Sequence, residues 1–151
     1  MNVRRATVMV CALLLGAISV SPAAQGPTRK YIDGRSAAEP NATPLSGAVL
    51  VGDTLYLSGQ LGASNNAKPE TAEAEAKAAL DKVKATLEKA GMTMDDLVSV
   101  TIFAPDVANY AAFNGVYRTY FTKEFPARAF IGSGPLLFGA RFEVQGIAVR
   151  R

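Results

Sequence analysis

The stretch GAVLVGDTLYLSGQLG, residues 47–62, decides the fold of this 151-residue chain. Ala48 to Val51 and Thr54 to Ser58 are rich in apolar and β-branched residues, which favour extended strands. Gly52-Asp53 stands between the two runs and is a turn signal. Two β-prone runs around a glycine turn predict a β-hairpin. The rest of the chain must supply the apolar residues that pack against it.

The segment PETAEAEAKAALDKVKATLEKAGM, residues 69–92, follows a polar loop and predicts an α-helix. Pro69 suits the first helical turn, and the acids Glu70, Glu73 and Glu75 suit the positive N-terminal end of the helix dipole. Gly91 favours termination of the helix. Apolar residues recur at spacings of three and four, which gives the helix one apolar face. They are Ala72, Ala76, Leu80, Val83 and Leu87.

The C-terminal half predicts three further strands and one helix. The strands are LVSVTIFA (97–104), ARAFIG (127–132) and ARFEVQGIAVR (140–150). The helix is VANYAAFNGVYRTYFT (107–122), with Asp106 as its cap. Its aromatic stripe is interpreted as core packing and consists of Tyr110, Phe113, Tyr117 and Phe121.

The element order is β-β-β-α-β-α-β-β when RKYIDG (29–34) is taken as a first edge strand. This order predicts a single α+β domain in which two helices cover one face of a mostly antiparallel sheet. In the last strand, Phe142 and Val144 face one way while Glu143 and Gln145 face the other. The second face of the sheet also carries apolar residues, so we expect a neighbouring subunit to cover it.

The N-terminal segment resembles a secretory signal peptide. Arg4 and Arg5 precede an uncharged, mostly apolar run, residues 6–20, and small residues follow it. We expect residues 1–24 to be the signal, 25–43 a lead-in segment with a candidate edge strand, and 44–151 the folded domain. The chain is then exported, periplasmic or secreted, without stable membrane insertion after cleavage. An uncleaved anchor is the alternative.

Composition excludes several classes of chemistry. Cys11, inside the expected signal, is the only cysteine, and the chain has no histidine. Disulfides, thiol nucleophiles, Ser–His triads and histidine-ligated zinc are therefore excluded from the mature chain. Removal of Arg4 and Arg5 leaves 14 basic residues against 13 acids. This balance does not indicate a nucleic-acid partner.

Arg128 and Glu143 are the leading candidates for chemistry, because each is a charged residue in an otherwise largely apolar strand. A structural salt bridge between them, or separate exposure at a sheet edge, is the alternative. Ser58 and Gly59 end the hairpin strand, where glycine permits close approach of a ligand or merely ends the strand. Asn114 lies within the aromatic helix, where it either contacts a buried polar group or points to solvent.

Five separated blocks together resemble the RidA (YjgF-type) reactive intermediate deaminase family. They are GDTLYLSGQLG, AKAALDKVKATLEKAGMTMDDLVSVTIF, FNGVYRTYF, FPAR and FEVQGIAV, in unbroken order over residues 44–150. The resemblance implies a chorismate-mutase-like fold, a homotrimer and ligand clefts between subunits. It also implies hydrolysis of enamine or imine intermediates such as 2-aminoacrylate to a 2-keto acid and ammonia, with no metal or organic cofactor.

The resemblance also implies residue roles. Arg128 holds the substrate carboxylate, Glu143 positions or activates water, and Ser58, Gly59 and Asn114 line the cleft. A guanidinium suits a carboxylate because its donors bind both oxygens. The alternative function is a non-catalytic trimeric module that binds small carboxylates or keto acids.

Two positions depart from the family pattern. Leu45 stands where archetypal members carry a tyrosine, so a hydroxyl contact to the ligand is missing or comes from another residue. Phe130 stands where a cysteine is common, and we expect it to reshape the cleft.

Overall fold

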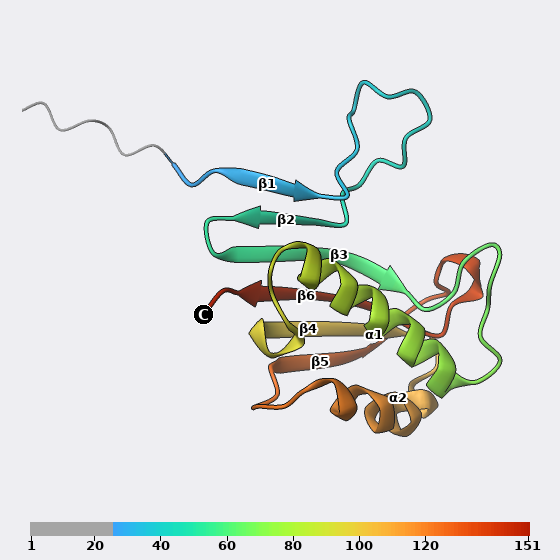
Figure 1. Ribbon diagram of the computed structural model, residues 1–151. Coiled ribbons are helices and arrows are strands. Elements are labelled where there is room, and N and C mark those ends of the chain that lie inside the picture. Colours follow the sequence, from blue (N-terminus) through green and yellow to red (C-terminus); the bar gives the residue numbers. More distant parts are fainter. Residues whose placement is uncertain (1–25) are drawn as a thin grey trace, which may run out of the picture.

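The computed structural model describes residues 26–151, so the expected signal peptide, residues 1–24, lies outside the described residues. Within these residues, six strands form one sheet in the order β1-β2-β3-β6-β4-β5 (Figure 1). The strands are β1 (Arg29–Ile32), β2 (Ala48–Val51), β3 (Thr54–Leu61), β4 (Leu97–Ala104), β5 (Ala127–Gly132) and β6 (Glu143–Val149). Among these six described strands, β4 and β5 pair in parallel, and the other neighbours are antiparallel. The predicted hairpin, first edge strand and element order are confirmed.

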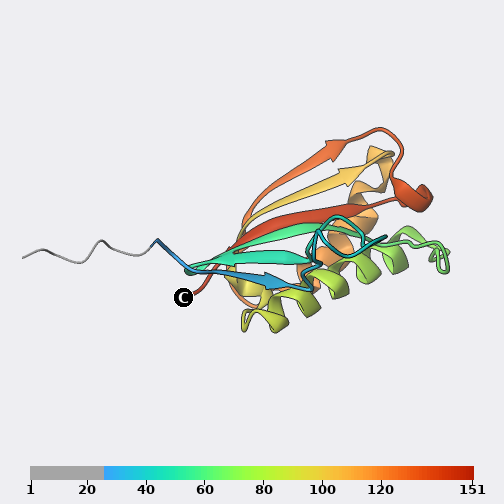
Figure 2. The same cartoon turned by 90° about the horizontal axis from the view of Figure 1, so that it is seen from above.

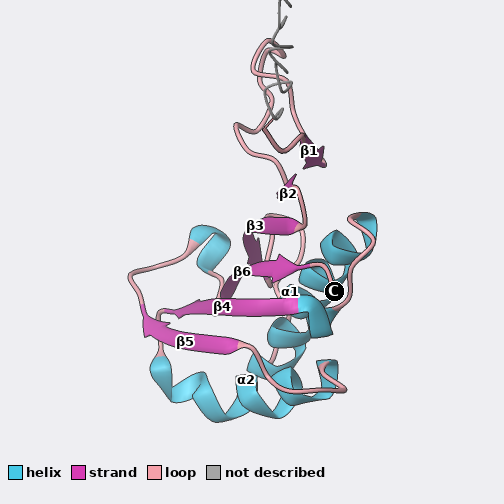
Figure 3. Cartoon of the chain, turned by 90° about the vertical axis from the view of Figure 1, so that its left-hand side faces the viewer, coloured by secondary structure: helices cyan, strands magenta, loops and turns pink. Residues whose placement is uncertain are grey.

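Both helices cover one face of this sheet, α1 (Ala72–Lys89) and α2 (Tyr110–Tyr117) (Figure 2). The core lies between the sheet and these helices, and its largest fully buried side chains include Phe113, Phe142 and Leu55. In Figure 3, α2 lies next to β5, at the end of the sheet away from β1. This α+β arrangement confirms the predicted fold class. Among residues 26–151, no helix is both long and apolar enough to span a bilayer.

The opposite face of the sheet, here called the open face, carries no helix in the described part of the chain. Four large apolar residues are exposed in its strands: Tyr31, Tyr56, Ile131 and Val149. Exposed apolar side chains on one sheet face are typical of a surface that another chain covers.

The start of α1 differs from the prediction. Thr71, not Pro69, borders the helix, because its side chain accepts a hydrogen bond from the Ala74 amide at 3.1 Å. Such a side-chain acceptor satisfies one of the free amides of the first turn. Pro69 therefore lies before the helix. Gly91 follows the C-cap with a φ of +74°, which confirms the predicted stop.

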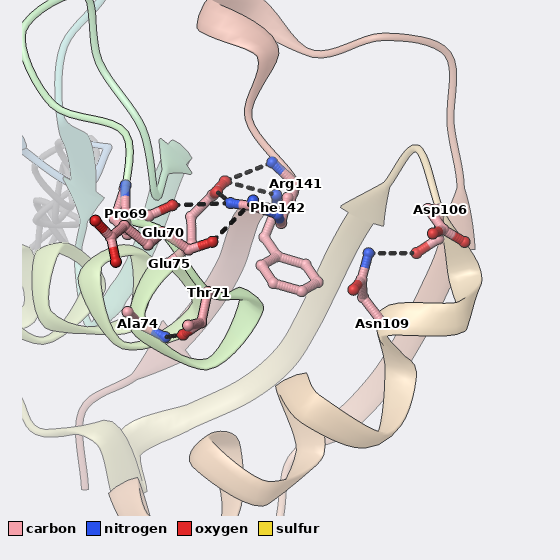
Figure 4. Close-up of polar contacts among 9 residues, drawn as sticks. All are labelled: Pro69, Glu70, Thr71, Ala74, Glu75, Asp106, Asn109, Arg141 and Phe142. Carbon is pink, nitrogen blue, oxygen red and sulfur yellow. Dashed lines mark hydrogen bonds and ion pairs between the residues drawn. The ribbon is translucent and has the colours of Figure 1, made fainter.

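Glu75 lies in the first turn of α1, as predicted, and it is fully buried, which the sequence did not indicate. Its carboxylate accepts hydrogen bonds from the backbone amides of Arg141 and Phe142 and from the Arg141 side chain, the last at 2.7 Å. Arg141 also donates to the carbonyls of Pro69 and Glu70 (Figure 4). This network fastens the start of α1 to the residues just before β6.

The predicted second helix is divided into three. A 3₁₀ turn, η2 (Val107–Asn109), precedes α2, and another, η3 (Arg118–Tyr120), follows it. The Asp106 side chain accepts a hydrogen bond from the Ala108 amide, so the predicted cap is confirmed, although it caps η2. Two further 3₁₀ turns are η1 (Met94–Asp96) and η4 (Leu137–Gly139).

Candidate functional site

Arg128 lies in β5 and points toward the helices. It pairs with Val100 of β4, whose side chain is buried beneath the helical layer. The guanidinium carbon lies 4.7 Å from the centre of the Tyr117 ring and 5.7 Å from that of Tyr110. Both distances allow cation–π attraction. Its Nη2 donates a long hydrogen bond of 3.4 Å to the Tyr110 hydroxyl, so two tyrosines of α2 hold the guanidinium in place.

A cleft of about 290 Å³ surrounds this guanidinium, and we call it the arginine cleft. It is lined by Tyr110, Asn114, Tyr117, Arg118, Phe125, Pro126 and Arg128. None of the ion pairs within residues 26–151 includes Arg128. The cleft therefore presents a cation with no carboxylate partner in the described part of the chain, which favours binding of an anion.

Polar groups inside the arginine cleft complement this charge. Within residues 26–151, the buried Asn114 Oδ1 and the Tyr117 hydroxyl have no hydrogen-bond partner. Burial raises the pKa of Tyr117 to about 12, although Arg128 acts in the opposite direction. The Asn114 amide, as a hydrogen-bond partner, and the Arg128 charge lower the pKa of Tyr110. Asn114 therefore lines the cleft, and its carbonyl oxygen is buried there without a hydrogen-bond partner.

Glu143 begins β6 and points to the open face. Its neighbours Phe142 and Val144 are buried beneath the helices, so the alternation of side chains turns Glu143 the other way. Phe103 of β4 and Leu61 of β3 pair with it across the sheet. The predicted alternation of this strand is confirmed.

The Glu143 side chain lies directly over Gly59. A Cβ atom added to Gly59 would overlap Oε1 of Glu143 and lie only 2.7 Å from its Cδ. The register of β3 against β6 shifts between Leu57 and Gln60, so Gly59 stands in a bulge of the sheet. Glycine is therefore needed here to leave room for the carboxylate.

Ser58 belongs to the same bulge, and its hydroxyl and amide groups both donate hydrogen bonds within the chain. Its hydroxyl donates to the Ser46 carbonyl at 2.6 Å, and its amide donates to the Gly47 carbonyl at 3.0 Å. These bonds fix the bulge to the segment before β2. Ser58 thus contributes to the shape of the site beside Glu143, and its oxygen lone pairs remain available as acceptors.

The candidate residues therefore form two groups. Arg128 and Asn114 lie on the helical side of the sheet, whereas Gly59 and Glu143 adjoin on the open face. A salt bridge between Arg128 and Glu143 within one chain, the alternative considered from the sequence, is excluded because the sheet separates them. For the same reason one chain alone does not bring the two side chains into a common crevice.

The two departures from the family pattern have different structural settings. Phe130 is not among the residues that line the arginine cleft. Instead it packs edge-on against Tyr110, with ring centres 5.1 Å apart, and against Phe113. It thereby supports one wall of the cleft. Leu45 is exposed in the loop before β2, where it lines a separate surface pocket with other residues of the segment 35–46.

Residues 26–151 contain no group of three or more acidic, histidine or cysteine side chains placed to hold a metal ion.

Comparison with known proteins identifies the family of this chain and finds the same fold in solved structures. A family model described as Endoribonuclease L-PSP matches residues 36–150. The chain belongs to the RidA (YjgF-type) family. A relative from Capra hircus named 2-iminobutanoate/2-iminopropanoate deaminase is 41% identical over 110 residues, covering 71% of this chain and 80% of the relative. The Escherichia coli K12 protein of the same name is 34% identical over 113 residues, covering 72% and 88%.

Solved RidA-family structures superpose closely on the described residues. The crystal structure of the Escherichia coli YjgF gene product has a TM-score of 0.71 at 31% identity and covers 81% of this chain and 100% of that one. Escherichia coli TdcF with bound serine has a TM-score of 0.71 at 27% identity, with coverage of 81% and 100%.

Three aromatic residues of the arginine cleft were not predicted from the sequence as site residues. Tyr110 and Tyr117 were assigned to core packing, which holds for the buried Tyr117, but both also contact Arg128. A signal existed, because Tyr110, Asn114 and Tyr117 are spaced by four and three residues and share one helix face. Phe125 lies in a loop, and no periodicity connects it to the cleft.

Proposed function

We propose that this chain hydrolyses reactive 2-enamino or 2-imino acids of the 2-aminoacrylate type to a 2-keto acid and ammonia. The names of the relatives at 34–41% identity support this reaction class. The observation that carries the proposal is the unpaired guanidinium of Arg128 in an open cleft. A half-buried cation without a partner is costly unless a ligand supplies the anion.

The reaction requires few catalytic groups from the protein. Water adds to the electrophilic imine carbon, forming a C–O bond while the C=N π electrons move to nitrogen. Two protons then reach nitrogen, the new hydroxyl group loses its proton as its oxygen forms the C=O bond, the C–N bond breaks, and the keto acid and ammonia leave. Arg128 holds the carboxylate, and Glu143 accepts a proton from the attacking water.

These two roles require two copies of the chain, since one sheet separates Arg128 from Glu143. We propose a homotrimer in which the arginine cleft of one protomer faces the Glu143 side chain of its neighbour. The exposed apolar residues of the open face, on the same side as Glu143, support such an interface. Light scattering of the purified chain measures its mass in solution, and a monomer at assay concentration would contradict this arrangement.

The activity is tested by generating imines with an amino-acid oxidase and measuring keto-acid release with and without the chain. We expect acceleration over the spontaneous rate. Loss of a charge-assisted contact costs about 1.5–3 kcal/mol, so Arg128→Ala lowers kcat/KM by about tenfold or more. Arg118→Ala, which removes another cleft cation, is the matched control and has the smaller effect. An unchanged hydrolysis rate in the presence of the chain refutes the proposal.

The alternative is a binding module without turnover. It uses the same Arg128 contact, and the solved relative with bound serine shows that a small carboxylate-bearing molecule has been found on this fold. Calorimetry with 2-ketobutyrate separates the two functions, because binding without accelerated hydrolysis supports the module.

We also propose that the chain is exported. The basic and apolar pattern of residues 1–24 supports this localisation. Cell fractionation followed by mass spectrometry tests it, and we expect a mature N-terminus near residue 24 or 25. A full-length chain confined to the cytoplasm contradicts export.

A further inference from the structure

We propose that the arginine cleft prefers imines whose side chain is aromatic, such as the imine of phenylalanine, over the imines of alanine and 2-aminobutyrate. This inference rests on the proposed function and adds the substrate class. It arises from three features around Arg128: two exposed aromatic walls, an unpartnered acceptor, and a volume larger than a three-carbon imine fills.

The first feature is the pair of walls. Tyr110 and Phe125 are 48% and 58% exposed, although both are large apolar residues that line the cleft. The Phe125 ring stacks on Tyr117 with ring centres 6.1 Å apart, and Tyr117 in turn lies against the guanidinium. A carboxylate on Arg128 therefore places the substrate side chain next to uncovered aromatic surface.

The walls are also held in place. Tyr110 packs edge-on against Phe130 at 5.1 Å, and Phe125 packs against Phe121 at 5.4 Å. Rings fixed before binding lose little conformational entropy when a ligand ring stacks on them. An aromatic side chain gains from the burial of its large area and from the geometry that aromatic pairs favour, whereas a methyl group gains only from the burial of a small area.

The second feature orients the ligand. Asn114 Oδ1 is buried in the cleft and has no hydrogen-bond partner within residues 26–151. Leaving an acceptor buried and unpaired is unfavourable, so a ligand N–H that reaches it is preferred. A 2-imino acid offers a carboxylate for Arg128 and an N–H for Asn114. Its third substituent is then left to contact Tyr110 and Phe125.

The third feature is size. A cleft of about 290 Å³ falls just below the roughly 300–1,000 Å³ typical of sites for larger organic ligands. The imine of alanine has only six non-hydrogen atoms and leaves most of this space to water. A phenyl group occupies it and displaces that water.

The test compares kcat/KM for imines generated from phenylalanine, 2-aminobutyrate and alanine by one amino-acid oxidase. We expect at least a tenfold preference for the phenylalanine imine. Tyr110→Ala and Phe125→Ala lower this preference severalfold, whereas Tyr110→Phe, which keeps the ring, preserves it. Phe138→Ala removes an exposed aromatic outside the cleft and leaves the preference unchanged. Circular dichroism confirms that each variant is folded.

The possible failures are distinct. Faster hydrolysis of the small imines with no preference for the aromatic one overturns this inference and leaves the proposed function intact. A preference that Tyr110→Ala and Phe125→Ala both preserve overturns the assignment to these walls. No acceleration with any imine overturns the proposed function, and this inference with it.

Discussion

Substitution of Gly59 by alanine tests the placement of Glu143 without removing it. The new Cβ would lie 2.7 Å from Cδ of Glu143, whereas ordinary contacts of such an atom begin at 3.4 Å. The carboxylate must therefore move by about 1 Å, a displacement that can reduce catalysis about 100-fold. We expect kcat for imine hydrolysis to fall by roughly that factor.

The stability of this variant should change little, because the group that moves is the end of a flexible side chain at the open face. Thermal unfolding measures this independently of kinetics. Gly134→Ala is the matched control, since a Cβ there meets nothing within 4 Å. Full activity of Gly59→Ala would refute the reasoning that the position of Glu143 over Gly59 is the catalytic one.

Three further predictions follow from the structure. Arg128→Ala and Glu143→Gln, each impaired alone, should regain activity when unfolded together and refolded as mixed oligomers, because about a quarter of the interfaces then combine both intact residues. A mixture no more active than its components contradicts a shared site. Burial raises the pKa of Tyr117 to about 12, so its contribution to stability is complete below pH 10 and is lost as the pH rises through 12. The unfolding free energy should fall by about 2–3 kcal/mol over that range, and Tyr117→Phe should lack this part of the loss in urea titrations. Glu75→Ala leaves the amides and guanidinium of Arg141 without their buried acceptor, and it should lower the unfolding free energy by about 3 kcal/mol. Glu75→Gln should cost less, and equal losses for the two variants would show that the buried charge, not the hydrogen bonds, matters.

The strands and the long helix could be predicted from the sequence because their apolar periodicity was clear. Glu143 is an example, since the buried residues on either side of it determine its direction. The direction of Arg128 could not be obtained in this way. Its neighbours Ala127 and Ala129 and the pair Phe130 and Ile131 are apolar on both sides of β5, so alternation alone does not identify its face.

Contacts between residues far apart in the sequence could not be predicted either. Glu75 occupies a position where a carboxylate suits the helix dipole, and nothing local indicates that residue 141 reaches it. The cap at Thr71 had a local signal, since threonine is a preferred N-cap residue, but the nearby Pro69 suggested an earlier start. Phe125 lines the arginine cleft because of the path of its loop, which the sequence does not indicate.

The separation of Arg128 and Glu143 by the sheet has a consequence for how activity depends on concentration. A solitary chain would bind the carboxylate of an imine at Arg128. Its own Glu143 would lie on the other face of the sheet and could not activate water at the bound imine. Catalytic competence would be acquired at assembly and lost on dilution below the dissociation constant of the oligomer. Specific activity measured over a dilution series would then report the strength of the subunit contacts.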